Sequence, residues 1–589
     1  MSLRIKNLEY FKKWLVLGIL IGVAAGVGAL LFYYAIVYAQ DLFLGGIAGV
    51  QLPSSVGEGG QPFVQGNMLL VPVSLLLGGL LSGFLVYTFA PEAEGHGTDA
   101  MIDAFHNKDG RIRRRVPLIK ALASAITIGS GGSAGREGPT AQIAAGIGAY
   151  ISDMLRLDSR DRRIAVLVGT GAGIGTIFKA PIGGALLAVE VPYKRDFETS
   201  ALFPAVVASA VGYSIFGSIV GFQPIFGYYL QAFDPLNLPL YAVLGIVTGL
   251  FVIFYVGVFY RVQEAFRKLR VKNHIKPFLG AIVVAAIAML FPEVMGVGYG
   301  WVQIFFNATT QNLPTYGIPL ILIIVLMPFA KIFATSFSIS SGGSGGVFAP
   351  GIFIGASIGL MFGLLFHSVS PGIATSIAPF VIVGALAFMG AAGKVPISVL
   401  LMVTEMTGSM QLLPAAMVAV ALSYLVSGDR TIYKSQVPTR RDSPVHMNEY
   451  STPMLESIKI SDLILEDISV RTTSSPGNAK RQMMELGVHR LPVVSGEHAR
   501  RLLGGVSMED LERARSGGNI AKLRLAKIAH AEYGDSARRA FMVMAKNDSV
   551  WAPVLKDGTY VGAITLGRLS AEYNRRFKKA RVVPSSHYR

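Results

Sequence analysis

The residues from Gly129 to Thr140 read GSGGSAGREGPT and set an arginine and a glutamate, Arg136 and Glu137, inside a turn of glycine and serine. Glycine lets the backbone take positive φ and lets other groups approach closely. Pro139 suits a first helical turn, where its missing N–H would have no intrahelical partner. The stretch therefore predicts a helix N-terminus, whose free amides and partial positive charge can hold an anion.

A second turn of this kind follows 211 positions later. Residues 130–135 and 341–346 share the pattern SGGSxG, and each is followed four residues later by a proline. Another pair, KAPIGGALLAVE at 179–190 and KVPISVLLMVTE at 394–405, is 215 positions apart. Two pairs in the same order predict two related halves, and glycine- or proline-interrupted apolar segments in matching positions point to the central site of a transporter.

The elements that carry these turns are predicted to lie in a membrane. Of 589 residues, 52% are hydrophobic and only 15% charged, whereas soluble proteins carry about a quarter charged residues. Apolar runs at 14–39, 68–90 and 240–260 reach the roughly 20 residues that span a bilayer. The net charge of +17 lies largely in short basic loops beside such runs, which indicates cytoplasmic loops and argues against nucleic-acid binding. With no cysteine and no close-spaced histidine pair, no metal site is expected.

Hydropathy falls sharply near Gly428, so two domains are expected. Residues 1–440 are predicted to form the transmembrane domain, with repeats at about 14–225 and 238–436, and residues 446–589 a soluble domain. The basic residues of the junction place the soluble domain in the cytoplasm. These residues are Arg430, Lys434, Arg440 and Arg441.

Glu137 is the costly residue of the first turn. A carboxylate within the membrane costs about 2.5–3.5 kcal/mol on insertion scales, so it needs a partner or a function. One interpretation is structural, an ion pair with Arg136 or a helix cap. The other is functional: the ionised carboxylate occupies the anion site and leaves it when protonated or displaced, as a gate, a proton carrier or both.

These residues resemble the CLC family of chloride channels and proton-coupled chloride exchangers. The family motifs GREGP and GxFAP stand at 135–139 and 346–350, and a tyrosine after the last membrane helix corresponds to Tyr433. The resemblance implies an α-helical membrane fold of inverted repeats. It also implies a homodimer in the plasma membrane, with one anion pathway in each subunit.

The resemblance also implies site residues. Glu137 corresponds to the gating glutamate, and chloride is the transported ligand, with no cofactor required. The residues implied in anion binding are His96, Gly135, Arg136, Gly138, Val347, Phe348 and Tyr433.

One departure from the family concerns the first anion motif, which usually reads GSGIP. Here residues 95–99 read GHGTD, so His96 stands where a serine usually contributes to the site. In one interpretation His96 donates an N–H in place of the hydroxyl. In the other, conduction is pH-sensitive because imidazole titrates near neutrality.

A second departure concerns protons. Many exchangers carry a glutamate just after the position of Glu190, and here that inner position is Val191. This absence favours a gated channel, with a proton-coupled chloride antiporter on the same fold as the alternative. Glu190 and Glu405 are expected to be structural and to pair with polar groups at helix ends.

The soluble tail repeats a strand, helix and strand plan and resembles a pair of CBS modules, an α/β domain. In such modules a Ser/Thr-x-x-Asp motif can hold a nucleotide ribose, which makes an adenine nucleotide a candidate ligand. Ser507 and Asp510 form this motif in the first copy, and the second has Thr565 but Arg568 in place of the aspartate. The other interpretation of the pair is a structural dimerisation platform without ligand. A further alternative for the whole chain is a nucleotide-sensing membrane protein. An enzyme is not expected, because no nucleophile–base set or Walker motif is present.

Overall fold

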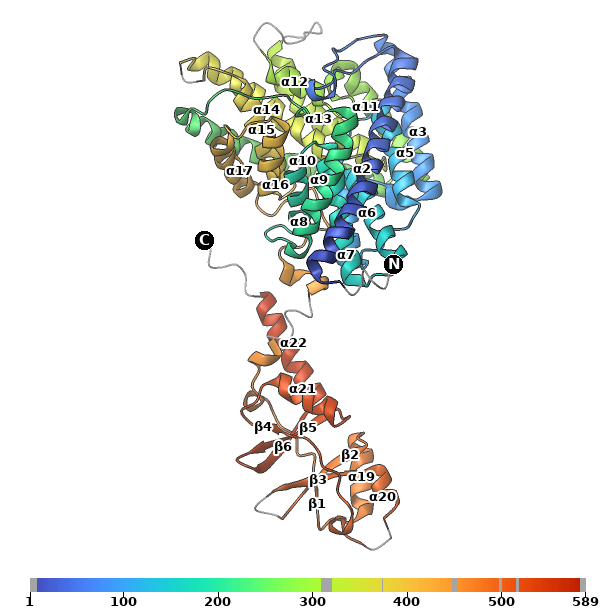
Figure 1. Ribbon diagram of the computed structural model, residues 1–589, viewed down its shortest axis with the longest axis vertical. Helices are drawn as coiled ribbons and strands as arrows, with labels where there is room; N and C mark the ends of the chain where they lie inside the picture. The colour runs from blue at the N-terminus through green and yellow to red at the C-terminus, as the bar shows by residue number, and fades with distance from the viewer. Residues whose placement is uncertain are drawn as a thin grey trace. The chain divides into compact units, whose positions relative to one another are not determined.

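The computed structural model describes residues 8–308, 320–372, 374–446, 454–496, 500–514 and 518–582. The chain divides into two compact units, a membrane unit (Met1–Val445) and a soluble unit (His446–Arg589). The described part of the membrane unit is built from helices, and the named strands all belong to the soluble unit (Figure 1).

The described α-helices of the membrane unit fall into two series of eight that correspond in order. The first series is α2 (Tyr10–Gln40), α3 (Val71–Phe89), α4 (Thr98–Asn107), α5 (Val116–Gly129), α6 (Glu137–Met154), α7 (Ser159–Ile177), α8 (Pro181–Glu190) and α9 (Leu202–Val220). The second is α10 (Leu238–Lys268), α11 (Lys276–Leu290), α12 (Tyr299–Phe306), α13 (Leu320–Ser340), α14 (Phe348–Val369), α15 (Ala378–Ala392), α16 (Pro396–Met406) and α17 (Leu413–Ser427). Both series begin with a 31-residue helix, and the third helix of each, α4 or α12, is short.

Seven described helical segments are long and apolar enough to cross a membrane. They are Tyr10–Ala48, Met68–Phe89, Thr199–Val220, Pro235–Lys268, Asn273–Leu290, Ile321–Ser340 and Phe348–Val369. The predicted runs at 14–39, 68–90 and 240–260 coincide with the first, second and fourth of these. The others among the sixteen helices are shorter or less uniformly apolar and end in irregular backbone, which a bilayer tolerates only where protein covers it.

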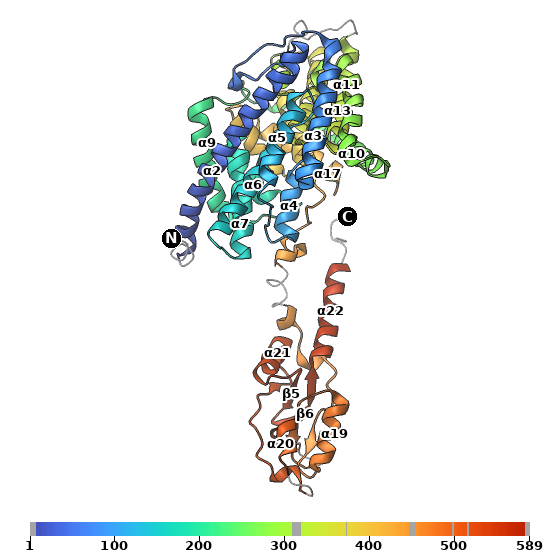
Figure 2. The same ribbon diagram turned by 90° about the vertical axis from the view of Figure 1, so that its right-hand side faces the viewer.

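Close helix packing provides that cover. In Figure 2, α2 runs alongside α9 over much of its length. Where they cross, Gly26 faces Gly212, and a Cβ added to Gly26 would lie 2.9 Å from the Gly212 Cα. Small residues allow such close approach between helices that gain little from hydrophobic burial in lipid.

The soluble unit consists of two modules of the same topology. The first contains β1 (Val470–Arg471), α19 (Pro476–Leu486), β2 (Arg490–Val494), β3 (Leu502–Ser507) and α20 (Met508–Glu512). The second contains β4 (Ala531–Glu532), α21 (Ala537–Lys546), β5 (Trp551–Lys556), β6 (Thr559–Thr565) and α22 (Leu566–Val582). In each module the first strand pairs in parallel with the second, which pairs antiparallel with the third. The repeat predicted for the tail is thus present as two small α/β layers.

Candidate functional site

The two glycine-rich turns meet in the interior of the membrane unit. The Gly135 amide donates to the Gly346 carbonyl at 2.7 Å, and the Gly346 amide donates to the Gly135 carbonyl at 2.5 Å. Two residues later in each turn, α6 begins at Glu137 and α14 at Phe348. The first amides of a helix have no intrahelical partner, so this pairing brings two partly positive helix ends together.

A third turn joins them. The Gly95 amide donates to the Gly343 carbonyl (2.9 Å), and the Gly345 amide donates to the Gly95 carbonyl (3.2 Å). This turn leads into α4 through Gly97, whose φ of 84° is readily available only to glycine. Three helix N-termini, those of α4, α6 and α14, therefore approach one another at the position where the sequence predicted an anion site.

Glu137 lies at this convergence and is only 2% exposed. Its Oε1 accepts a hydrogen bond from the Tyr299 hydroxyl at 2.5 Å, and its Oε2 accepts from the Ala349 amide at 3.4 Å. Ala349 is the second residue of α14, so the carboxylate rests on the helix end that comes from the other half of the unit. Negative charge at a helix N-terminus is stabilised by the helix dipole.

Arg136 turns away from that position. The structural interpretation expected an ion pair between Arg136 and Glu137, but the described residues show Arg136 paired with Glu58 instead. Its guanidinium also lies 5.5 Å from the ring of Tyr33 and 5.4 Å from the ring of Tyr299. The side chain of Arg136 is thus neutralised within a buried cluster and presents no unpaired charge to an anion.

The other residues expected from the GREGP and GxFAP motifs serve different purposes. The Gly135 amide is engaged by the Gly346 carbonyl, so in this conformation it is not available to an anion. Gly138 allows close packing, because a Cβ there would collide with the His96 carbonyl. Val347 and Phe348 stand at the start of α14, where amides lack intrahelical partners.

His96 and Tyr433 lie together beside the start of α4. Their ring centroids are 5.4 Å apart, and His96 is 7% exposed. Among the described residues, His96 Nδ1 has no hydrogen-bond partner. Thr98, the first residue of α4, lies next to the hydroxyl of Tyr433. A buried polar nitrogen without a partner is costly, so this nitrogen is available to a ligand.

A third repeated motif was missed when the two halves of the sequence were compared. Residues 91–97 read PEAEGHG and residues 292–298 read PEVMGVG, 201 positions apart, with proline, glutamate and both glycines in common. Each of these turns lies over a fully buried lysine, Lys120 or Lys331, whose ammonium group donates to two carbonyls of the turn at distances of 2.7–3.2 Å. The shared pattern P-E-x-x-G-x-G was the signal that could have revealed it.

Glu190 and Glu405 confirm their expected structural role. Glu190 accepts hydrogen bonds from two amides in the first turn of α16, at 3.2 and 2.8 Å, and from the hydroxyl of Ser398. Glu405 accepts from two amides in the first turn of α8, at 3.0 and 2.7 Å. Each glutamate thus caps a helix of the opposite half.

Val191 follows α8 directly and is fully buried. Its carbonyl accepts a hydrogen bond from the Gln436 side chain at 2.9 Å, and Gln436 also donates to the Gly393 carbonyl at 2.9 Å. Val191, which stands where many exchangers carry a glutamate, is therefore buried by apolar packing and contacted by the amide side chain of Gln436.

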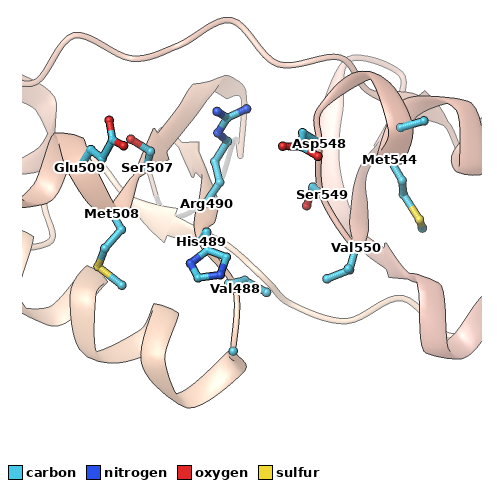
Figure 3. Close-up of a pocket in the computed structure, with 12 residues that line it drawn as sticks. Val488, His489, Arg490, Ser507, Met508, Glu509, Met544, Asp548, Ser549 and Val550 are labelled. Carbon is cyan, nitrogen blue, oxygen red and sulfur yellow. The ribbon is translucent and has the colours of Figure 1, made fainter.

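In the soluble unit, a cavity of about 740 Å³ lies between the two modules (Figure 3). His489, Arg490 and Ser507 face it from the first module, and Asp548 and Ser549 from the second.

The predicted ribose-binding residues are only partly brought to this cavity. The hydroxyl of Ser507 donates to the Asp510 carboxylate at 2.6 Å in a capping box at the start of α20. These hydrogen bonds from Ser507 hold the pKa of the Asp510 carboxyl below its usual value. Thr565 is not among the lining residues, and Arg568 donates to Glu466 at 3.0 Å. The structure therefore does not unite the two motif copies in one site.

Comparisons with known proteins agree with this geometry. A family model described as voltage gated chloride channel matches residues 78–428, and one described as CBS domain matches residues 460–517. A putative chloride channel protein ClcB-like from Ralstonia nicotianae is 30% identical and covers 65% of this chain and 89% of its own length. The H(+)/Cl(-) exchange transporter ClcA from Salmonella arizonae is 28% identical and covers 75% of this chain and 92% of its own.

A solved structure of a slow cyanobacterial Cl-/H+ antiporter has a TM-score of 0.60 at 22% identity and covers 70% of this chain and 94% of that one. This likeness shows a shared fold, the inverted-repeat helical fold that the resemblance to the CLC family implied. The two named relatives are a putative channel and a transporter, and neither is named as an enzyme.

Proposed function

Because the chain belongs to the voltage gated chloride channel (CLC) family, a family of membrane chloride transport proteins, we propose that it exchanges chloride for protons. The sequence favoured a gated channel because Val191 lacks a carboxylate. The alternative is better supported, since a curated relative that covers three quarters of the chain is named as an exchange transporter.

The observation that carries the proposal is the carboxylate of Glu137 on the N-terminus of α14. An ionised carboxylate and chloride are both anions that accept hydrogen bonds from the same helix end, so they compete for it. Protonation removes the charge of Glu137 and weakens its hold on the Ala349 amide. Chloride can then enter as the protonated side chain leaves, which links anion movement to proton movement at a single group.

We expect anion binding at this place to be weak enough for transport. The donors would be the amides of Val347 and Phe348, the hydroxyl of Tyr433 and the ring N–H of His96. Arg136 adds no unpaired charge because it is paired with Glu58. Partial charges of helix ends can admit an ion and still release it, which a buried full charge would not.

For the surroundings of the site, we propose a homodimer in the plasma membrane with the soluble unit in the cytoplasm. The basic residues beside the apolar spans, such as Arg267 and Lys268 in the last turn of α10, support this orientation. Each subunit would contain its own pathway, since the three helix ends described above all come from one chain.

The test uses purified full-length protein in liposomes with a chloride gradient and no initial proton gradient. We expect chloride to drive protons uphill, recorded as a change of external pH, and Glu137→Ala to abolish this movement. Glu264→Ala, an exposed glutamate at the end of α10, is the matched control and should leave coupling intact. A zero-current potential at the chloride Nernst value without proton movement would identify a channel and refute exchange.

Nucleotide regulation by the soluble unit is the second candidate function. The cavity between the modules is large enough for an adenine nucleotide and carries Arg490, a cation suited to phosphate. Equilibrium dialysis of the full-length protein with radiolabelled ATP and AMP tests this. We expect Arg490→Ala to weaken binding and Thr565→Ala to leave it unchanged; binding that is absent, or insensitive to Arg490→Ala, contradicts the assignment.

A further inference from the structure

Two described residues donate hydrogen bonds to the Glu137 carboxylate: Ala349 through its backbone amide and Tyr299 through its side chain. Tyr299 is the first residue of α12 and follows Gly298, which has a φ of 94°. The residue is 3% exposed, and its hydroxyl donates to Glu137 Oε1 at 2.5 Å. A hydrogen bond to an ionised acceptor is about twice as strong as one between neutral groups.

The ring of Tyr299 is fixed on several sides. Phe226 meets it edge-on at a centroid distance of 5.6 Å, and Phe178 lies at 6.4 Å. The guanidinium of Arg136 covers it at 5.4 Å. A ring held by three neighbours cannot move freely, so its hydroxyl is a preset donor for one position of the carboxylate.

Tyr299 also separates Glu137 from a second cavity. This cavity has a volume of about 240 Å³ and lies at the C-terminal end of α2. Tyr299, Arg136 and Glu58 are among its lining residues, and Glu137 is not. To move toward this cavity, the carboxylate must first break its bond to Tyr299.

The other half of the unit offers an internal comparison. Thr98 corresponds to Tyr299, because each is the first residue of the short helix after a positive-φ glycine, and the two lie 201 positions apart. Thr98 lies next to the hydroxyl of Tyr433, as Tyr299 lies next to the carboxylate of Glu137. The equivalent positions of the two short helices thus each lie beside one residue of the predicted pathway.

We propose that Tyr299 is a positioning residue that latches the Glu137 carboxylate over the anion site and sets how readily this gate opens. The inference rests on the proposed function of Glu137. By this proposal, a residue of α12 that lies outside both family motifs, GREGP and GxFAP, controls the rate and the pH dependence of transport.

Other titratable or charged side chains face this pair. Arg136 comes from the turn before α6, Glu58 from the loop after α2, and Tyr33 from α2 itself. Tyr433 approaches from the segment after α17. Removing the Tyr299 hydroxyl takes away a donor to the ionised carboxylate and leaves these groups in place, so protonation of Glu137 becomes easier.

The experiment compares Tyr299→Phe with the unaltered full-length protein in liposomes, with chloride efflux recorded between pH 4 and 8. We expect roughly tenfold faster efflux at pH 7, from the loss of one hydrogen bond to a charged group. We also expect the pH of half-maximal efflux to rise by about one unit. Tyr33→Phe is the matched control, because Tyr33 lines the same cavity and covers Arg136; it should change neither quantity.

A double variant separates the latch from other effects. In a Glu137→Gln background, which removes the ionised acceptor, Tyr299→Phe should have no further influence on efflux. An equal effect in both backgrounds, or an unchanged rate and pH profile in the single variant, overturns the latch. If Glu137→Ala leaves proton coupling intact, the proposed exchange mechanism fails instead, which is a separate outcome.

Discussion

The two halves of the membrane unit share a scaffold but not a chemistry. Gly135 and Gly346 pair with each other, and Lys120 and Lys331 each support an equivalent turn. At the same offset of 211 positions, however, Arg136 and Glu137 of the first half correspond to Val347 and Phe348 of the second.

The difference between the halves shows that the backbone and the side chains of the site are under different constraints. Backbone groups buried in an apolar interior must be satisfied in both halves, which keeps the scaffold the same. Side chains at the helix ends have no such obligation and can diverge. The nearly symmetric frame thereby becomes asymmetric, since one helix end bears a carboxylate and the other bears an aromatic ring.

The largest expected effect comes from replacing Glu137 and Phe348, the corresponding residues of the two helix ends, each by alanine. Glu137→Ala should reduce chloride-coupled proton movement to background, whereas Phe348→Ala should retain coupling with at most a several-fold change in chloride turnover, because Phe348 offers its amide and not its ring. Parallel recordings of pH and chloride in liposomes give both numbers. Equal loss of coupling in the two variants would mean that the halves share the chemistry after all.

The buried lysines test the shared scaffold. Lys120→Met and Lys331→Met should both lower the free energy of unfolding by about 1–3 kcal/mol for each carbonyl left without a donor. Thermal melting in detergent is the measurement, with Lys268→Met, on an exposed helix end, as the control. A large loss in one variant and none in the other would show that the two turns are not equivalent supports.

The two capping glutamates, Glu190 and Glu405, allow a comparison of smaller effects on stability between the halves. Glu190→Ala and Glu405→Ala should each cost about 0.5–2 kcal/mol, the range for a lost helix cap. Glu190 should cost more, because it also accepts from the hydroxyl of Ser398 and is 4% exposed. The same melting experiment decides, and a greater loss for Glu405 would contradict this ranking.

The smallest effect concerns the corresponding asymmetry in the soluble unit. Ser507→Ala should cost about 1 kcal/mol through the capping box, and Thr565→Ala less. The lowered pKa of Asp510 means that its contribution is present above the unfolded value of about 3.9 and is lost as pH falls through the folded value. Melting at pH 7 and pH 3 should therefore show the Ser507→Ala difference shrinking in acid.

The sequence predicted the parts of the site that backbone geometry dictates. Glycine at the turns near Gly135 and Gly346 allows close backbone approach, and proline suits the first turn of the helix that follows, so the spacing of these residues was visible. Tyr299 was not, because nothing local distinguishes it and its bond to Glu137 joins positions 162 apart. Glu58, the partner of Arg136, lies in a loop after α2 without a repeating pattern, so this pair could not be predicted. The pair with Glu137, offered by the structural interpretation, is not among the ion pairs of the described residues.

The exchange of caps between the halves has a consequence for biosynthesis. Glu405 is made 222 residues after Gly183, the amide it serves at the start of α8. At about 5–20 residues per second, the ribosome needs on the order of 10–45 s for that stretch. Throughout this interval the newly inserted first half has a helix end without its acceptor. Assembly of the unit therefore waits for its last helices, and a chain interrupted after α9 would leave polar backbone uncovered.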